Sequence, residues 1–177
     1  MAIGLIFVNI VKLLMNPFAD FNINSKTWIY AADRLLNETE SKDINKILNE
    51  FTLGWKAHEL PLKAKAQVFY NAILVIMVDE NYNTVSGCGI DKSVSTIKNI
   101  GEKYHVNFFN RLLIHILIDD KIKIYNTLQL KYAIRSSEVN SNSLVLNTMV
   151  QNKKMFENQL FIKLSESWAG KYLVQTA

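Results

Sequence analysis

The sequence predicts a single α+β domain with a largely antiparallel mixed sheet and helices packed mainly on one face. Two amphipathic helical patterns alternate with two hairpin patterns along the 177 residues, an order typical of α+β folds. Hydrophobic residues make up 49% and charged residues 20% of the chain, a globular composition that is long enough to bury one core.

The domain is expected to begin with a short strand and an amphipathic helix. In KTWIYAADRLL the bulky residues Trp28 and Tyr30 alternate, which favours a strand leading into a turn. Asn37 followed by Glu40 is a capping pair, and apolar residues then recur at helical spacing. We therefore predict a helix over residues 38–56.

The apolar run in QVFYNAILVIMVD is the expected centre of the sheet. Residues 72–78 are uninterrupted, which favours a central strand covered on both faces. ENYN supplies turn residues, so TVSGCGI is expected to return antiparallel beside that strand. Asp91 is placed as the N-cap of a second helix. The buried stripe of this helix is expected to be Val94, Ile97, Ile100 and Tyr104.

The second half of the chain predicts shorter elements. RLLIHILIDDKIKIYN is typical of a hairpin with Asp119 and Asp120 at its turn, and TLQLKYAI of a short helix. SSEVNSNS is a polar loop. The tail alternates apolar strand-like pieces, SLVLNTMV and LFIKL, with a helical piece around NKKMFEN.

Residues 1–15, MAIGLIFVNIVKLLM, are expected to form an apolar extension outside a domain of residues 16–177. Asn9 and Lys12 interrupt the run, which is shorter than the ~20 residues of a spanning helix. Lys12 comes late for a signal peptide, and no clean cleavage site follows. Docking on the domain, contact with a membrane surface and a start at Met15 stay open. We favour an extension over an anchor.

Charge and cysteine content bound the partners. A net charge of +4 permits anionic partners without requiring them. The single Cys88 forms no internal disulfide, which fits a cytoplasmic protein, and no Cys or His cluster has zinc spacing. We expect no metal and no cofactor.

Nucleotide hydrolysis of the Walker type is excluded by the residues around the one Gly-Lys pair. Tyr172 follows Gly170-Lys171 where Ser or Thr is required, and Ser165 stands in place of the first glycine. G-x-S-x-G, H-E-x-x-H and G-x-G-x-x-G motifs are also missing.

The candidate catalytic residues are His58, Asp79, Cys88 and Asp91. Backbone amides at a helix start favour a thiolate, and a histidine brought to Cys88 would complete a thiol–imidazole pair. The structural alternative is a buried thiol, acids that are solvated in a turn, and Asp91 as a cap. We favour this alternative.

Aromatic residues suggest a binding surface. Trp28, Trp55 and Trp168 each lie in an apolar pattern and are expected to be core residues or anchors of a ligand or partner groove. His115 is expected to be packed within a strand and His105 to lie in a loop. Lysines and aromatics interleave in KIKIYNTLQLKY, a pattern compatible with weak nucleic-acid binding.

Five stretches carry a resemblance to a known family: WIYAADRLL, WKAH, VDE followed by SGCGIDKSV, NFFNR and LSESW. Together, over about residues 21–173, they resemble a small uncharacterised bacterial family whose members often carry the label "ABC transporter ATPase". The label conflicts with the missing P-loop and the missing L-S-G-G-Q motif. The resemblance implies no activity, cofactor or catalytic residue.

We therefore expect a cytoplasmic, non-enzymatic domain that binds another protein or a small ligand. The first alternative is a thiol-dependent or acid–base enzyme centred on His58, Asp79, Cys88 and Asp91. The second is a weak nucleic-acid binder.

Overall fold

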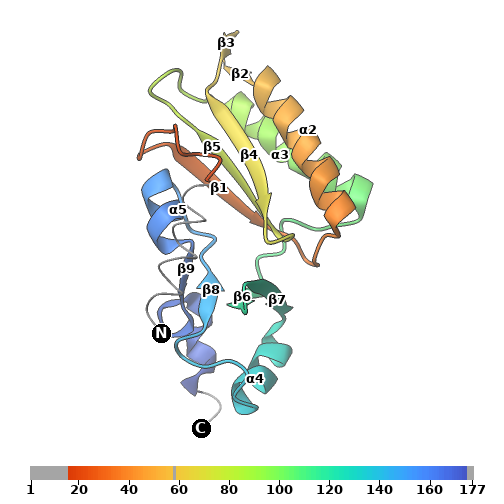
Figure 1. Cartoon of the computed structure of the whole chain (residues 1–177), viewed down its shortest axis with the longest axis vertical. Helices are drawn as coiled ribbons and strands as arrows, with labels where there is room; N and C mark the ends of the chain where they lie inside the picture. Colours follow the sequence, from red (N-terminus) through yellow and green to blue (C-terminus); the bar gives the residue numbers. More distant parts are fainter. Residues whose placement is uncertain (1–15, 58, 175–177) are drawn as a thin grey trace.

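Four α-helices and three antiparallel sheets make up the part of the chain that the computed structural model describes, residues 16–57 and 59–174 (Figure 1). The α+β prediction is confirmed. The apolar extension predicted for residues 1–15 and the candidate His58 lie outside the described residues.

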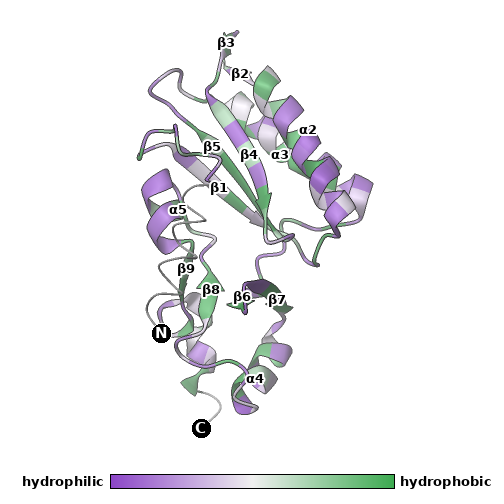
Figure 2. Ribbon diagram, in the orientation of Figure 1, coloured by the Kyte–Doolittle hydropathy of each residue, from purple (hydrophilic) through white to green (hydrophobic). Residues whose placement is uncertain are grey.

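The main sheet has the strand order β1-β5-β4, with every pairing antiparallel. Its strands are β1 (Lys26–Ala31), β4 (Ala64–Phe69) and β5 (Ile73–Val78). All six residues of β5 are buried, and the strand is apolar along its length in Figure 2. The predicted central strand is confirmed.

The hairpin partner of β5 was predicted wrongly. TVSGCGI does not return beside β5, because the preceding strand β4 occupies that side. Tyr70 and Asn71 turn the chain with φ of 53° and 52°, and the Ala72 N–H donates to the Phe69 carbonyl at 3.1 Å. This is the geometry of a type I′ turn, which the sequence concealed because neither central residue is glycine.

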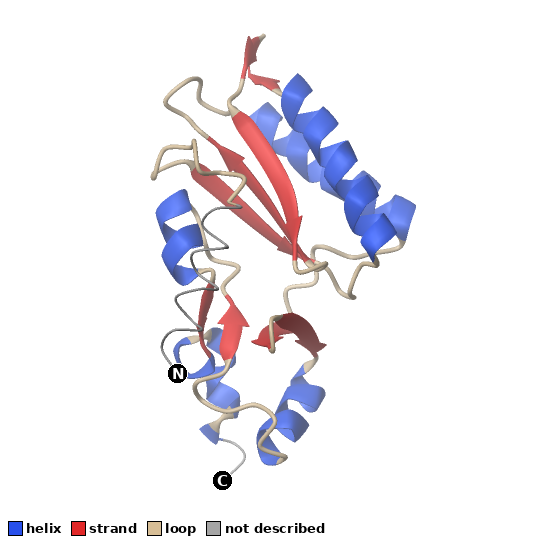
Figure 3. Ribbon diagram, viewed as in Figure 1, coloured by secondary structure: helices blue, strands red, loops and turns tan. Residues whose placement is uncertain are grey.

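Two long helices, α2 (Glu38–Gly54) and α3 (Gly87–Tyr104), cover one face of the main sheet (Figure 3). The capping box predicted for Asn37 and Glu40 is present in α2, which ends two residues before the predicted position. The buried residues of α2 and α3 share a core with Leu74, Ile76 and Val78, the even-numbered positions of β5.

The start of α3 corrects the second helix prediction. Ser86 is the N-cap, and its hydroxyl accepts the Gly89 N–H at 3.2 Å. Asp91 therefore lies inside the helix and does not cap it. The Gly-Cys-Gly stretch forms the first turn of α3 because Ser86 supplies the acceptor earlier in the chain than Asp91.

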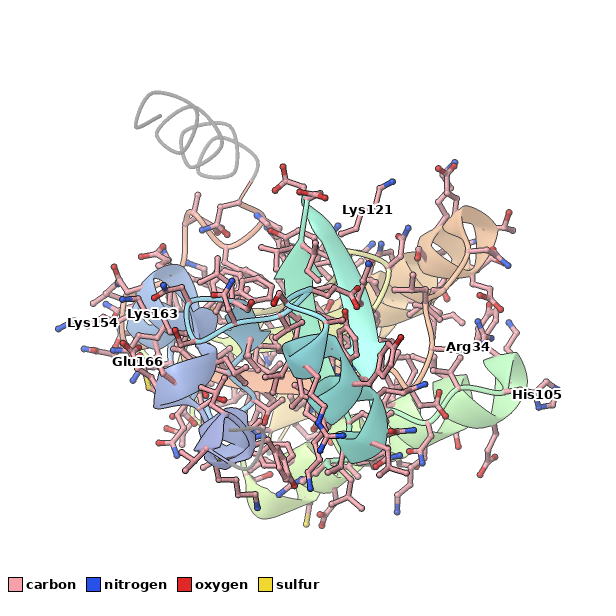
Figure 4. The ribbon with its side chains drawn as sticks, turned by 90° about the horizontal axis from the view of Figure 1, so that it is seen from below. Arg34, His105, Lys121, Lys154, Lys163 and Glu166 are labelled. Atoms are coloured by element: carbon pink, nitrogen blue, oxygen red, sulfur yellow. The ribbon has the colours of Figure 1, made fainter. Side chains whose placement is uncertain are left out.

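The C-terminal end of α3 has a tight turn. His105 is left-handed with φ of 52°, and the Val106 N–H donates to the Gly101 carbonyl at 2.9 Å. A Cβ at Gly101 would lie 2.6 Å from the Val106 oxygen, so this close approach requires glycine. His105, predicted as loop, projects into solvent at this end (Figure 4).

A second sheet packs below the first, with the order β7-β6-β8-β9 (Figure 1). Its strands are β6 (Ile114–Ile118), β7 (Lys121–Tyr125), β8 (Leu144–Leu146) and β9 (Phe161–Lys163). Asp119 and Asp120, with φ of 49° and 58°, form the predicted hairpin turn. The strands that were expected in one sheet are therefore distributed over three sheets.

Short helices complete this half: α4 (Thr127–Arg135), α5 (Lys153–Gln159) and 3-10 turns at Leu164–Glu166 and Trp168–Tyr172. The predicted helices at TLQLKYAI and NKKMFEN are confirmed. A two-stranded ribbon pairs β2 (Lys56–Ala57) with β3 (Leu60–Pro61). Within residues 16–57 and 59–174, no helix has the length and apolarity needed to cross a membrane.

Candidate ligand-binding groove

A groove of about 860 Å³ lies beside the outer edge of β1. One wall is β1 itself. The other walls come from residues 108–115, which precede and begin β6, from residues 145–152, and from Trp168. Segments far apart in the sequence therefore meet at one edge of the main sheet.

Five aromatic side chains line this groove: Trp28, Tyr30, Phe108, Phe109 and Trp168. Trp28 and Tyr30 alternate along β1, so both lie on the face of the sheet that α3 covers. The Tyr30 and Phe109 rings meet edge to face with centroids 5.6 Å apart. The Trp168 side chain is 48% exposed. Aromatic faces of this kind suit a ligand with apolar or flat parts.

The backbone of β1 is fixed at both ends of the groove. The Thr27 N–H donates to the Gln151 carbonyl at 2.9 Å, and the Asp33 N–H donates to the Asn107 carbonyl at 3.0 Å. Peptide groups of a strand alternate in direction, so the N–H and C=O of Ile29 point outwards like those of Thr27. The outward peptide groups of Ile29 have no hydrogen-bond partner in the part of the chain described above.

Lys26 and Arg111 both border the groove, but only Lys26 is held in an ion pair within the described residues. Lys26 pairs with Glu80, with 3.7 Å between Nζ and Oε1, and its Nζ lies 5.7 Å from the Trp28 ring centroid. Arg111 is exposed and makes no ion pair or hydrogen bond to any residue in 16–57 or 59–174. Because Arg111 has no such partner in the described chain, its guanidinium is available to a ligand. Burial raises the pKa of Tyr30, while a hydrogen bond to Ser93 and the charge of Arg111 act in the opposite direction.

His115 closes one end of the groove. It is 3% exposed, and its Nε2 lies 2.7 Å from the carbonyl of Ala32, the residue that follows β1. Burial lowers the pKa of His115, although contacts with the carbonyls of Ala32 and Leu113 act in the opposite direction. The packed histidine predicted at this position is confirmed.

The three tryptophans have different environments. Trp28 and Trp168 line the groove. Trp55 is 2% exposed, with its ring centroid 6.5 Å from that of Trp28. Its Nε1 has no hydrogen-bond partner among the described residues, and it lies 3.4 Å from where a Cβ at Gly89 would be. Trp55 therefore supports Trp28 from the core and does not reach the groove.

Asp79 does not lie in solvent, as predicted for a turn residue, but is 3% exposed. Its Oδ2 lies 3.3 Å from Lys63 Nζ and accepts the Asn22 N–H at 3.2 Å. Desolvation opposes the charge of Lys63, but the hydrogen bond to Asp79 and nearby negative groups raise the Lys63 pKa overall. The prediction failed because the segment around Asn22 folds over the end of β5. The Asp79 carboxylate therefore joins the segment around Asn22 to Lys63.

Glu80 also differs from a solvated turn residue. It is half-buried, and its Oε1 accepts the Val85 N–H at 3.1 Å in addition to pairing with Lys26. Glu80 thus orders the loop that leads into α3.

Cys88 is exposed in the first turn of α3, so the prediction of a buried thiol is wrong. The helix starts at Gly87, and this places the residue on the outer surface rather than beneath the sheet. Asp91 is also exposed, one turn further along the helix. Neither residue lines the groove, and the contacts of Asp79 are with other groups. Within the described ranges, no set of three His, Cys, Asp or Glu residues is arranged to hold a metal ion.

The positive charge of KIKIYNTLQLKY, the stretch suggested for nucleic-acid binding, is partly neutralised by Glu138. Lys123 Nζ lies 2.8 Å from Glu138 Oε1, which also accepts a hydrogen bond from the Tyr125 hydroxyl at 3.1 Å. The hydrogen bond from Lys123, and after it the one from Tyr125, lowers the pKa of Glu138. Burial, with Glu138 adding to it, raises the pKa of Tyr125 to about 12. Lys121 is exposed at the tip of the hairpin, next to the acidic turn residues Asp119 and Asp120 (Figure 4).

Comparison of the chain with protein-family models, curated proteins and solved structures gave no match in any of the three. The geometry of the groove is therefore the basis for the function proposed below. Sequence analysis noted NFFNR only for its resemblance to a family and did not predict Phe109 and Arg111 as groove residues, because this irregular segment carries no chemical motif.

Proposed function

We propose that this protein is a non-enzymatic binding domain that takes its ligand in the groove beside β1. The observation that carries the proposal is the convergence of Trp28, Tyr30, Phe109 and Trp168 around a groove of about 860 Å³. This volume lies in the range of about 300–1,000 Å³ typical of ligand sites. Partly exposed aromatic side chains that gather from distant segments favour binding over simple core packing.

The charges favour a ligand with an acidic group. Arg111 is the cation at the groove that lacks an ion pair in the described chain, whereas Lys26 is held by Glu80. A guanidinium binds carboxylates with paired hydrogen bonds, and aromatic faces contact the apolar part of the same ligand. We therefore expect the groove to prefer carboxylates over amines of equal size.

The test is a titration of ¹⁵N-labelled protein with benzoate and indole-3-acetate, with benzylamine as the charge control. Chemical-shift changes are expected to cluster around Trp28, Tyr30, Arg111 and Trp168. Trp168→Ala should weaken binding about three- to tenfold, because one aromatic contact is lost. Tyr132→Ala removes an aromatic side chain that is 73% exposed and lies outside this groove, and it should leave binding unchanged.

Shifts that scatter over the surface, or equal losses in the two variants, would overturn the proposal. The enzyme alternative has its own test. Cys88 should react with one equivalent of a thiol reagent in the folded protein, because it is exposed. Substrate turnover that is lost in Cys88→Ser but kept in Trp168→Ala would place the function at α3 and not at the groove.

A further inference from the structure

We infer that the occupant of the groove is an extended, acidic peptide segment of another protein, which adds a strand to the unpaired middle of the outer edge of β1. This inference rests on the proposed function and specifies its ligand. Strand addition is a common mode of peptide recognition, in which backbone hydrogen bonds supply affinity and side-chain pockets supply specificity.

The backbone of β1 has the required free groups. The Ile29 N–H and C=O point into the groove region without a partner among residues 16–57 and 59–174. A peptide residue placed opposite Ile29 would exchange two hydrogen bonds with it, as in a regular antiparallel pair. Backbone groups left unpaired on an edge strand are a template for such pairing.

The ends of the groove limit the length of the segment. Thr27 is already bonded to Gln151 and Asp33 to Asn107. Five residues, 28–32, lie between these two bonds. At about 3.3 Å per residue, an added strand of about five residues spans about 17 Å and fits between them. His115, which contacts Ala32, stands at the end where the added strand must leave β1.

Side-chain alternation predicts the sequence preference. The peptide residue opposite Ile29 would point to the same face of the sheet as Ile29, and its two neighbours to the face of Trp28 and Tyr30. Phe109 and Arg111 border that face of the groove, and the Arg111 charge acts on the Tyr30 hydroxyl. An acidic side chain is therefore expected beside Tyr30, and β-branched or aromatic side chains elsewhere.

The experiment uses blocked pentapeptides as probes, with acetyl-Thr-Val-Glu-Val-Thr-amide as the parent. One derivative is N-methylated at its first, third and fifth residues and another at its second and fourth. Only one of the two sets of N–H groups can face β1, so one derivative should bind at least about tenfold more weakly than the other. Equal affinities of the two derivatives would overturn strand addition.

Two protein readouts accompany the titration. The Ile29 amide should become protected from hydrogen exchange on binding, whereas the Trp28 amide, which faces β5, should not change. Arg111→Gln should weaken the parent peptide about two- to fivefold. Arg111→Glu should reverse the preference towards a peptide with Lys in place of Glu. Arg135→Glu, an exposed site on α4, is the matched control and should leave both affinities unchanged.

The outcomes separate this inference from the function on which it rests. Binding of benzoate or indole-3-acetate in the groove without binding of any peptide would overturn the inference and leave the proposed function standing. Loss of both would overturn both. Protection of Ile29 in the protein alone, with self-association seen by sedimentation, would show that a second copy is the occupant and would also overturn the inference.

Discussion

The two outer edges of the main sheet are treated differently by the rest of the chain. On the β4 edge, Asn45 of α2 accepts the Val68 N–H at 2.8 Å, and Lys65 Nζ donates to the Pro17 carbonyl at 2.7 Å. On the β1 edge, both ends are bonded but the centre at Ile29 is not. One edge is fastened by side chains, and the other is left beside a groove.

This difference shows how one small sheet can combine stability with binding. Lysines and side-chain caps along an edge strand prevent it from pairing with another chain. Aromatic side chains and free peptide groups do the opposite, because they offer contact area and hydrogen bonds to a partner. The β4 edge therefore holds the fold together, and we assign binding to the β1 edge.

The largest expected effect comes from the ion pair of Asp79 and Lys63, which joins the end of β5 to the start of β4. Asp79→Ala removes the counter-ion of Lys63 and the acceptor of the Asn22 N–H from a site that is 3% exposed. The free energy of unfolding should fall by about 2–3 kcal/mol, measured by urea denaturation. Asp20→Ala removes a carboxylate near the same lysine, but its side chain is 65% exposed, so the loss should be clearly smaller. Equal losses would contradict the role given to Asp79.

A smaller effect is expected from the cap on β4. Asn45→Ala leaves the Val68 N–H without its acceptor and should lower the free energy of unfolding by about 1–2 kcal/mol. Asn49→Ala, at an exposed position on the same helix, should have almost no effect. Loss of this cap also leaves the β4 edge open to pairing with another copy of the chain. Sedimentation should therefore show more self-association for Asn45→Ala than for Asn49→Ala. Identical behaviour of the two variants would remove the distinction between the edges.

The free energy of unfolding should depend on pH through His115, which lies near the end of β1. Burial lowers the pKa of His115 in the folded chain, so the unfolded chain binds the proton more readily. The free energy of unfolding should therefore fall as the pH drops through the ordinary histidine value of about 6.5, and level off below the folded pKa. The decrease between about pH 7.5 and pH 5 should be smaller in His115→Gln than in the unchanged protein. An unaltered pH dependence would show that His115 does not contribute.

The smallest effect on stability is expected in the groove itself. Trp168→Ala should change the free energy of unfolding by less than about 0.5 kcal/mol, because the side chain is 48% exposed. The same substitution should weaken ligand binding, which would separate the binding edge from the stabilising one. A loss of stability as large as that of Asp79→Ala would indicate that Trp168 belongs to the core.

Local signals in the sequence determined several elements of the fold. The sequence predicts the capping pair of Asn37 and Glu40, the buried run of β5 and the turn at Asp119 and Asp120, and the structure contains all three. Each depends on residues within a few positions of one another, because helical spacing, capping and two-residue turns are set by the local chain. The turn at Tyr70 and Asn71 is also local, but it lacks the glycine that identifies such turns.

Only the tertiary structure decided which side chains meet. Asn22 and Asp79, 57 positions apart, form one contact, and Ala32 and His115, 83 positions apart, form another. The sequence predicted Trp28, Trp55 and Trp168 to be core residues or groove anchors, but gave no reason to place Trp28 and Trp168 around one groove with Arg111. That placement follows from packing one sheet on another, where burial of apolar surface favours compaction without specifying in the sequence which distant residues come together.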